Sequence, residues 1–407
     1  MRNHNSVLER ARKLDLSASE GLWAETTRLI PSGAQTFSKA PFQHVDGVAP
    51  KFIVRGEGCR VWDLDGNSYI DYMLGLGPVI LGHGDPTINS AIAEVLAQGI
   101  ALPLPHPAET DLAGVLKRLI PCAEMVRFGK NGSDATSGAI RAARGITGRD
   151  KVARCGYHGW QDWFIGSTSR NLGVPTQVSE LTLSFEYNKI ETLECLFSEN
   201  RGDIAAVILE PVTFEEPENE FLDHVKWLTH DKGALLIFDE VITGFRIDMG
   251  GAQNVYNVTP DFACFGKAIA NGMPISAVVG KEEYMQIFDE VFFSFTFGGE
   301  LASIAAAKAT IHALEERQVI AHIDAMGSRL KTGYNKLVRD MRLDKVTLMT
   351  GFNWWPEYLF FDPRTSIARN PVIVSTRNSS MRNFESSGHV YLRISSNRGY
   401  RSHSWSL

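Results

Sequence analysis

The sequence lacks several patterns that define common protein classes. Its 407 residues contain five cysteines, scattered and never in a CxxC pair, which excludes a disulfide framework and a zinc ribbon. No apolar run approaches the roughly 18 residues of a membrane span. The charged N-terminus has no apolar stretch typical of a secretory signal. We therefore expect a cytoplasmic protein with reduced, buried thiols.

Excess positive charge is also missing. The 41 Lys and Arg residues are outnumbered by 47 Asp and Glu, which gives a formal net charge of -6. This balance argues against nucleic acid or an anionic membrane as a partner. The hydrophobic content of 44% and charged content of 22% are those of an ordinary globular protein. The length allows one large α/β domain with a smaller partner.

Short apolar runs that alternate with helical patterns occupy the middle of the chain. Runs such as MVRF, KVAR, IAAVILEP, GALLIFDE, FACFG and ISAVVG predict strands, with amphipathic stretches between several of them. This alternation predicts a mostly parallel sheet with helices on both faces. Before these runs, residues 51–75 read as three short strands separated by turns. Residues 300–340 read as two long helices joined near residues 318–321.

Two segments place polar groups directly after predicted strands. Gly132, Ser133 and Asp134 begin an Ala-rich helix, and free N–H groups at a helix start bind phosphate well. The alternative is an ordinary N-cap at Ser133 or Asp134. Asp239 ends the run GALLIFDE, where ligands of parallel sheets are bound. The alternative is a structural acid pair with Glu240.

Two further segments hold an isolated lysine and a group of aromatic residues. Lys267 lies among apolar and small residues in PDFACFGKAIANGMP, where desolvation favours a neutral, nucleophilic amine that forms Schiff bases. It would otherwise extend to solvent or pair with an acid. Tyr157, His158, Trp160 and Trp163 follow the run KVAR and either stack on a planar ring or pack internally. Together the four segments supply what a pyridoxal phosphate site needs, namely a lysine for the aldehyde, a carboxylate for the ring nitrogen and a phosphate cradle.

The motifs that carry these residues resemble the class III aminotransferases of pyridoxal phosphate fold type I. The segments VWDLDGNSYIDYMLGLGPVILGHGDP, NGSDATSGAIRAARGITGRDKV, YHG, GALLIFDEVITGFR and FTFGGE occur in the order and spacing of that family. The resemblance runs from about Leu22 to about Arg339 and is greatest to the glutamate-1-semialdehyde 2,1-aminomutase branch. It implies an α/β fold: a large domain with a mostly parallel seven-stranded sheet flanked by helices, and a smaller α/β domain from both terminal segments. The expected division is residues 1–60, 61–320 and 321–407.

The resemblance also implies a role for each matching residue. Lys267 would form the Schiff base and carry the proton, and Asp239 would bind the pyridine nitrogen. The other cofactor contacts would be Gly132, Ser133 and Asp134 at the phosphate, Tyr157 and Val241 on the two ring faces, His158 of the YHG motif, and Thr296. Thr296 would reach the cofactor of a neighbouring subunit, which implies a homodimer with shared active sites. Lys267, Asp239 and Tyr157 would be catalytic, with pyridoxal 5'-phosphate as the cofactor and no metal.

Three departures from the aminomutase branch bear on the substrate. Lys39 stands where that branch carries an arginine, Glu215 where it tends to carry an asparagine, and Trp160 follows the YHG motif. These three residues are the expected substrate contacts. We therefore favour an aminotransferase that moves an amino group from a small-molecule donor to a carbonyl acceptor in two half-reactions. Intramolecular transfer of the aminomutase type is the alternative, and a catalytically dead protein of the same fold is a third.

The end of the chain departs most from the family. After about Pro363 it is rich in Ser and Arg, nearly free of acids and weakly periodic. The sequence predicts residues 364–407 to be atypical, truncated or disordered. A genuinely divergent tail is the alternative.

Overall fold

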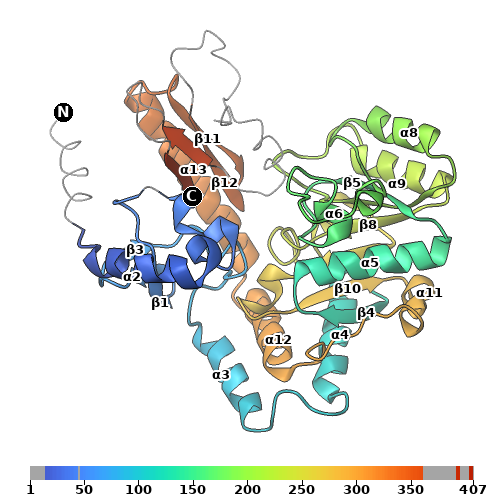
Figure 1. The fold of residues 1–407 in the computed structure, drawn as a ribbon, viewed down its shortest axis with the longest axis horizontal. Coiled ribbons are helices and arrows are strands. Elements are labelled where there is room, and N and C mark those ends of the chain that lie inside the picture. The colour runs from blue at the N-terminus through green and yellow to red at the C-terminus, as the bar shows by residue number, and fades with distance from the viewer. Residues whose placement is uncertain (1–13, 45, 361–390, 395–402, 407) are drawn as a thin grey trace.

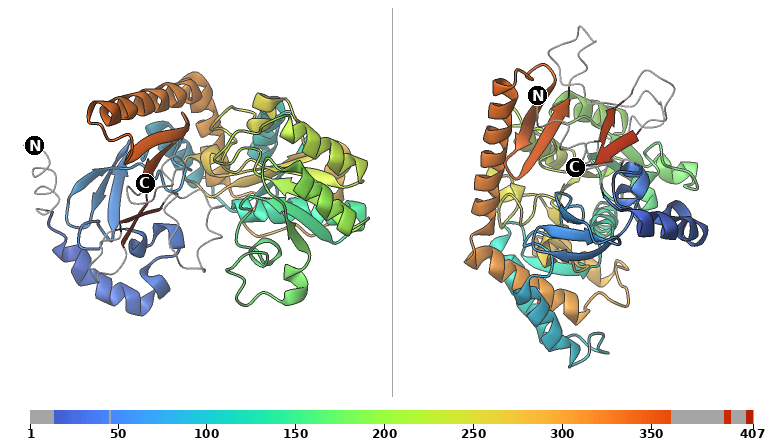
Figure 2. Two further views of the ribbon diagram at one scale, coloured as in Figure 1. Left: turned by 90° about the horizontal axis from the view of Figure 1, so that it is seen from above. Right: turned by 90° about the vertical axis from the view of Figure 1, so that its left-hand side faces the viewer.

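The structure is a computed structural model that describes residues 14–44, 46–360, 391–394 and 403–406 (Figure 1). The large domain contains the central sheet, and the N-terminal segment lies beside α13 and the hairpin that follows it (Figures 1 and 2). Most of the predicted atypical segment 364–407 lies outside the described residues. Within it, strands β13 (Tyr391–Ile394) and β14 (His403–Ser406) pair antiparallel. No described helix is both long and apolar enough to cross a bilayer.

A seven-stranded sheet forms the centre of the large domain. Its strand order is β4-β10-β9-β8-β7-β5-β6. Strand β10 runs antiparallel to β4 and β9, and the remaining pairings are parallel. The bounds are β4 (Met125–Gly129), β5 (Lys151–Cys155), β6 (Thr182–Ser184), β7 (Ile204–Leu209), β8 (Leu235–Asp239), β9 (Phe262–Phe265) and β10 (Ser276–Gly280). The predicted mostly parallel seven-stranded sheet is confirmed.

Helices cover both faces of this sheet, and each face has its own buried cluster. One face packs on α5 (Gly132–Thr147), α6 (Asp162–Ile165), α11 (Glu282–Met285) and η5 (Gln286–Asp289). The other packs on α4 (Pro107–Leu119), α8 (Ile190–Glu199), α9 (Phe221–Asp231) and α12 (Leu301–Glu316). Helix α5 buries four alanines, and their small side chains let it lie close to the strands: Ala135, Ala139, Ala142 and Ala143.

Strand alternation decides which side chains reach the α5 face. In β8, Leu235 and Ile237 belong to the α5 cluster, whereas Leu236 and Phe238 belong to the opposite one. Because successive side chains of a strand point to opposite faces, Asp239 falls on the α5 side. In β7, Ala206 and Ile208 belong to the α5 cluster, so by the same alternation Glu210, the residue after that strand, also falls on the α5 side. The period-2 pattern thus directs two carboxylates toward the start of α5.

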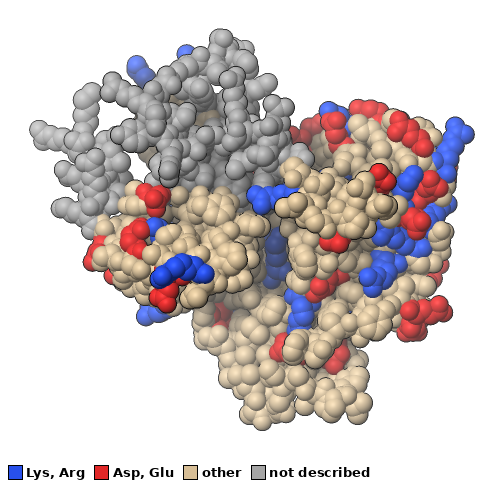
Figure 3. All heavy atoms as spheres, in the orientation of Figure 1, with Lys and Arg blue, Asp and Glu red and all other residues tan. Residues whose placement is uncertain are grey.

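The N-terminal part of the described chain forms a separate three-stranded antiparallel sheet of β1 (Ile53–Glu57), β2 (Arg60–Asp63) and β3 (Ser68–Ile70), as the turn signals predict. Helix α2 (Ser17–Leu29) and the short turns η1 (Pro31–Gly33), η2 (Phe37–Lys39) and η3 (Pro41–Gln43) precede it. Helix α3 (Pro86–Leu96) leads to α4. On the face shown in Figure 3, charged side chains of both signs lie on the large domain, whereas the connection between α3 and α4, residues 97–106, contains no Asp, Glu, Lys or Arg.

The C-terminal part of the described chain contains α13 (Val319–Asp340) and the hairpin of β11 (Thr347–Phe352) and β12 (Trp355–Phe360). Helices α12 and α13 are joined at residues 317–318, slightly before the predicted 318–321. The hairpin turn packs directly on α13, because a Cβ at Gly327 would lie 1.6 Å from the carbonyl oxygen of Asn353. Asn353 also donates a hydrogen bond to Asp324 at 2.9 Å. Short helices α7 (Thr176–Ser179), α10 (Ala252–Tyr256) and η4 (Lys267–Ala270) complete the described elements.

Candidate active site

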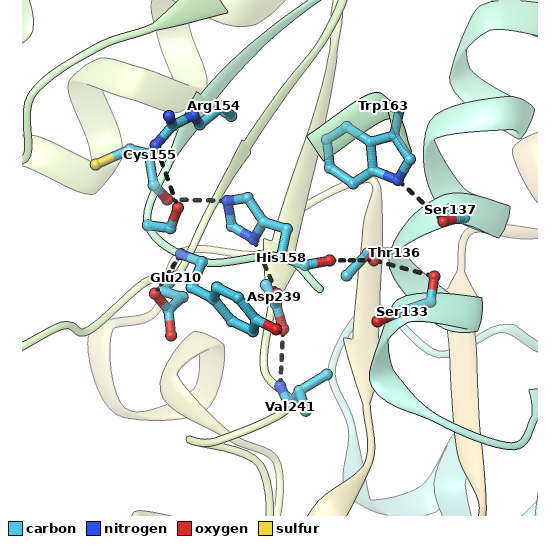
Figure 4. Close-up of polar contacts among 12 residues, drawn as sticks. Ser133, Thr136, Ser137, Arg154, Cys155, His158, Trp163, Glu210, Asp239 and Val241 are labelled. Atoms are coloured by element: carbon cyan, nitrogen blue, oxygen red, sulfur yellow. Dashed lines mark hydrogen bonds and ion pairs between the residues drawn. The ribbon is translucent and has the colours of Figure 1, made fainter. Parts of the chain in front are cut away.

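The candidate active site lies at the carboxyl ends of the parallel strands, beside the start of α5. Asp239 is the last residue of β8, Glu210 directly follows β7, and Lys267 lies two residues after β9. His158 belongs to the loop after β5. Figure 4 shows Asp239, Glu210 and His158 gathered together, with Ser133 of α5 nearby. The structure thus brings residues of all four predicted segments to one edge of the sheet.

Asp239 and His158 form a buried pair, with 5% and 2% of each residue exposed. His158 Nδ1 lies 2.9 Å from Asp239 Oδ2, and its Nε2 lies 3.0 Å from the carbonyl oxygen of Cys155. A carbonyl only accepts, so Nε2 carries a proton and donates it. The contact between Nδ1 and Oδ2 then requires a second proton between imidazole and carboxylate. Asp239 Oδ1 accepts from the Val241 N–H at 3.1 Å, so the carboxylate is held at both oxygens.

Lys267 has a strained backbone and an amine that loses its proton more easily than usual. Its φ of 44° lies in the left-handed region, which costs a residue with a side chain about 1–3 kcal/mol. Burial lowers the pKa of its amine, and the nearby Arg246 guanidinium acts in the same direction. The carboxylates of Glu210 and Asp239 oppose this shift without cancelling it. The neutral amine is therefore favoured relative to a solvated lysine.

The start of α5 is capped by Asn131 rather than by Ser133 or Asp134. Asn131 Oδ1 accepts from the Asp134 N–H at 3.1 Å. The Asp134 carboxylate turns back and accepts from the N–H groups of Lys130 and Asn131, each at 3.0 Å. The N-cap alternative therefore placed the cap two or three residues too late, because Asn131 is the last residue with extended backbone. Asp134 orders the helix start through this capping box.

The helix start also offers unused donors in a space kept clear by glycines. Within the described residues, no acceptor is found for the N–H groups of Gly132 and Ser133. A Cβ at Gly132 would lie 2.9 Å from Val241 Cγ1, and one at Gly266 would lie 3.5 Å from the same atom. Nearby, the buried Ser276 Oγ has no hydrogen-bond partner in the described chain. Free N–H groups, an unsatisfied hydroxyl and a close glycine approach fit a bound phosphate.

The loop that carries Tyr157 is fixed by two glycines. Gly156 has φ 100°, and a Cβ there would lie 2.5 Å from Glu210 Oε2. Gly159 has φ 112°, and a Cβ there would lie 2.2 Å from Ser133 Oγ. The Tyr157 N–H donates to Glu210 Oε2 at 2.9 Å. Tyr157 stays 38% exposed, so its side chain is accessible to a planar ligand.

The two tryptophans of this loop have different surroundings. Trp163 is buried, donates from Nε1 to Ser137 Oγ at 2.9 Å and stacks against His158, so internal packing accounts for it. Trp160 is 64% exposed, and its backbone N–H donates to Ser133 Oγ at 3.2 Å. The Trp160 backbone therefore lies beside the helix start that would hold the phosphate.

Three other predicted residues are not brought to Lys267 within this chain. Lys39 ends the short turn η2 and is exposed. Glu215 is exposed in the loop before α9, where its charge acts on Tyr187. Thr296 is exposed between η5 and α12. Of the three expected substrate contacts, only Trp160 lies beside the residues described above.

Sequence reasoning missed two charged residues at the site, Glu210 and Arg246. Glu210 ends the run IAAVILEP as Asp239 ends GALLIFDE, so the rule of strand carboxyl ends could have found it. Burial and the charge of Asp239 raise the pKa of Glu210, which the Tyr157 N–H and the Lys267 amine counteract. The sequence offered no such indication for Arg246, because it lies within the loop after β8 and not at the end of a strand.

Comparisons with known proteins agree with this arrangement. The family described as Aminotransferase class-III matches residues 42–350. The chain is 38% identical over 358 residues to the 3-aminobutyryl-CoA aminotransferase of Cloacimonas acidaminovorans, covering 86% of this chain and 85% of that protein. It is 38% identical over 355 residues to the glutamate-1-semialdehyde 2,1-aminomutase of Roseiflexus castenholzii, covering 83% and 81%. Among solved structures, the FumI protein of Sphingopyxis sp. MTA144, with bound PLP, superposes with a TM-score of 0.79 at 29% identity, covering 84% and 83%.

The fold and the site define an enzyme of pyridoxal phosphate fold type I. The chain belongs to the class III aminotransferases. The predicted family, fold class, enzyme class and cofactor are thereby confirmed, and pyridoxal phosphate is the cofactor of this family. The chain is 38% identical both to an aminotransferase and to an aminomutase, so sequence identity does not distinguish the two activities.

Proposed function

We propose that this chain is an aminotransferase that uses Lys267 to move an amino group from a small-molecule donor to a carbonyl acceptor in two half-reactions. The observation that carries the proposal is the meeting of Lys267, the Asp239–His158 pair and the start of α5 at one sheet edge. Pyridoxal phosphate, when bound, supplies an aldehyde for the amino group and a ring that stabilises negative charge on the substrate carbon.

Lys267 would act first as nucleophile and then as base. Its lowered pKa makes the neutral amine available to bind the aldehyde. Once an amino donor has displaced it, the same amine would take a proton from the substrate carbon and give it up again, as a general base and then a general acid. Glu210 and Asp239 favour the protonated amine, so they help it take up that proton.

The other residues would bind and orient. The Asp239 carboxylate, held in place by its contact with His158, would keep the nitrogen of the cofactor's pyridine ring protonated. The free N–H groups of Gly132 and Ser133 would bind the phosphate. Tyr157 and Val241 would lie on opposite ring faces, and Trp160 at the mouth would contact substrate. A Trp160→Ala change that left the KM of every substrate unaltered would remove Trp160 from this set.

An intramolecular amino transfer of the aminomutase type is the second candidate, favoured by the relative from Roseiflexus castenholzii. An aminomutase converts one substrate without an acceptor, whereas an aminotransferase needs a second carbonyl compound. Turnover of an amino donor only when 2-oxoglutarate or pyruvate is present would support the first reading. Conversion of glutamate-1-semialdehyde with no acceptor present would establish the second.

The direct test is the visible absorption spectrum of the full chain reconstituted with pyridoxal phosphate. We expect a yellow band that is absent from Lys267→Ala and that disappears when L-glutamate or another amino donor is added. A band that ignores every donor would contradict the aminotransferase reading. The absence of any band from the wild-type chain would contradict the role of Lys267 and favour the dead-enzyme alternative.

We further propose a cytoplasmic homodimer with shared active sites. All five cysteines are free thiols, which suits a reducing compartment, but Cys59 and Cys195 are exposed, so the expectation that all the thiols are buried is wrong. The loop of Thr296 and the connection after α3 expose large apolar side chains, and the Leu301 N–H donates to the Ile100 carbonyl at 3.0 Å to join these segments. The exposed side chains are Phe292, Phe297, Leu96, Leu102 and Leu104. Apolar surface of this kind marks a protein contact.

Mixing two defective variants tests the shared site. In a mixed dimer of Lys267→Ala and Thr296→Ala, one site contains both native residues. We expect such mixtures to regain cofactor binding that the parent proteins lack or hold weakly, measured after unfolding and refolding the two together. Purely additive behaviour, or a monomer in sedimentation equilibrium, would contradict the shared dimer.

A further inference from the structure

Arg246 is a buried guanidinium that has no acidic partner among the residues that the structure describes. The residue is 8% exposed, and burial lowers its pKa to about 10. Its Nη2 donates to the Gly77 carbonyl at 2.9 Å and its Nη1 to the Trp354 carbonyl at 3.3 Å. Among the ion pairs of the described residues, none includes Arg246. A buried charge held only by carbonyl dipoles is expensive, so its retention calls for a reason.

Arg246 joins three parts of the chain next to Lys267. Gly77 belongs to the loop before α3, Arg246 to the loop after β8, and Trp354 to the turn of the β11–β12 hairpin. A Cβ at Gly77 would lie 3.7 Å from Arg246 Nη2 and 4.0 Å from Lys267 Cδ. The Gly77 backbone therefore lies against both the guanidinium and the stem of the lysine.

Strained backbone is concentrated at this junction. Leu76, directly before Gly77, has φ 78°, and Phe245, directly before Arg246, has φ 59°. Lys267 itself has φ 44°. Left-handed residues with side chains persist only where the surrounding structure fixes them, and they cluster at functional sites. Three such residues next to one guanidinium indicate that the surrounding structure fixes the position of Arg246.

We propose that Arg246 is a positioning residue for Lys267: it fastens the loop of Gly77 and the hairpin turn of Trp354 over the lysine stem, and it keeps a fixed positive charge beside the amine. This inference rests on the proposed role of Lys267. The two hydrogen bonds of Arg246 would keep the aliphatic part of the Lys267 side chain in place. The positive charge of Arg246 would favour the neutral amine that a nucleophile and base requires.

Other charges around Lys267 act against Arg246. Glu210 after β7 and Asp239 at the end of β8 favour the protonated amine, and Arg246 from the loop after β8 disfavours it. The Tyr157 hydroxyl is uncharged near neutral pH, because burial and the charges of Asp239 and Glu210 raise its pKa. Among the described residues, Arg246 is thus the cation that acts on the amine against two acids, and the pKa of one of them, Glu210, is raised to about 8 by burial and by the charge of Asp239. Removal of Arg246 should leave the amine under the influence of the acids alone.

Arg149 provides a matched control at the opposite end of the sheet. It also lacks an acidic partner among the described ion pairs, and its Nη1 donates to the carbonyls of Ile204 at 3.0 Å and Lys232 at 2.8 Å. It therefore joins separate segments through carbonyls, as Arg246 does. It lies before β5, at the amino ends of the strands, away from Lys267.

The test compares Arg246→Gln, Arg246→Lys and Arg149→Gln in the full chain. One readout is the pH midpoint of the absorption band of the protein reconstituted with pyridoxal phosphate. The second is the pH dependence of Lys267 acetylation by acetic anhydride in chain without added cofactor, measured by peptide mass spectrometry. Removal of a nearby positive charge should raise both midpoints in Arg246→Gln by roughly one pH unit.

Arg246→Lys retains the charge, so its midpoints should stay within about 0.3 units of wild type, as should those of Arg149→Gln. Unchanged midpoints in Arg246→Gln, or an equal shift in Arg149→Gln, would overturn the proposal. If the wild-type chain forms no absorption band but the acetylation midpoint still moves, the proposed function fails while the link between Arg246 and Lys267 stands. If Arg246→Gln does not fold, Arg246→Ala can be refolded in the presence of millimolar guanidinium. The two midpoints are then compared with guanidinium present and after its removal, and removal should raise them.

Discussion

Two buried aspartates at opposite ends of neighbouring strands each contact a histidine at 2.9 Å. Asp239 ends β8 and contacts His158, whereas Asp261 directly precedes β9 and contacts His230. Both carboxylates are almost inaccessible, with 5% and 1% of their side chains exposed. By local chemistry alone the two pairs would be hard to tell apart.

Their surroundings separate them. Asp261 also accepts from the Leu236 N–H at 2.8 Å and lies 3.4 Å from the Lys281 amine, so its oxygens are fully engaged in joining β8, β9 and α9. It lies at the amino ends of the parallel strands, and Asp239 lies at the carboxyl ends beside Lys267 and α5. Position in a parallel sheet, rather than the Asp–His contact, distinguishes the candidate catalytic acid from the structural one.

The largest contrast is expected for activity. Asp239→Asn keeps the side-chain shape but removes the charge, so we expect transaminase kcat/KM to fall about a thousandfold. Asp261→Asn should change it by less than about twofold. Steady-state assays of both proteins after cofactor saturation would check this. Comparable losses in the two variants would erase the distinction drawn from the sheet.

Stability should show the opposite order. Asp261→Asn weakens hydrogen bonds to a buried charge, and we expect its free energy of unfolding to fall by about 2 kcal/mol. Urea titration of protein without cofactor measures this loss, with Asp231→Asn as a control at an exposed ion pair. A stable Asp261→Asn protein would show that the triad with His230 and Lys281 is dispensable.

Substitution of the two histidines should affect activity in the same order as substitution of the two aspartates, with a smaller difference between the variants. His158→Gln removes a charge-assisted hydrogen bond to Asp239, worth about 1.5 kcal/mol, so activity should fall about tenfold. His230→Gln should leave activity near wild type, because His230 faces the other end of the sheet. Parallel kcat/KM measurements would decide, and a larger loss in His230→Gln would be incompatible with the assignment.

The smallest effect concerns acid stability. Burial raises the pKa of Asp261, but bonds from His230 and Leu236 and the charge of Lys281 outweigh it and hold the pKa below the ordinary 3.8. A carboxyl with a lowered folded-state pKa stabilises above its unfolded pKa and loses that contribution as pH falls through the folded value. The stability gap between wild type and Asp261→Asn should therefore be constant above about pH 5 and narrow below 3.8. Urea titrations from pH 7 to pH 3 would reveal a gap that instead widens.

The sequence predicted those parts of the site that depend on local pattern. Apolar runs located the strands, and the rule of carboxyl ends placed Asp239. The unusual neighbours of Lys267 marked it as chemically distinct. The short strand β6 and the cap at Asn131 were missed, because three residues are too few for a periodic pattern and several polar residues competed for the cap.

Contacts between distant segments were beyond sequence reasoning. The Arg246–Trp354 bond joins residues 108 positions apart, and the Arg246–Gly77 bond joins residues 169 apart. No periodicity or spacing specifies such contacts, since they depend on how the hairpin and the loop before α3 dock on the large domain. Trp163 illustrates the same limit, because only the packed structure shows that it contacts His158 rather than a ligand.

The bond from Arg246 to Trp354 has a consequence for the order in which the protein is made. Domains generally fold as they leave the ribosome, from the N-terminus onward. A nascent chain that has emerged through residue 340 already contains every strand of the large sheet and both members of the Asp239–His158 pair. It lacks Trp354, whose carbonyl accepts a hydrogen bond from Arg246. The contact between Arg246 and the hairpin turn therefore forms only after the strands of the large sheet have been synthesised.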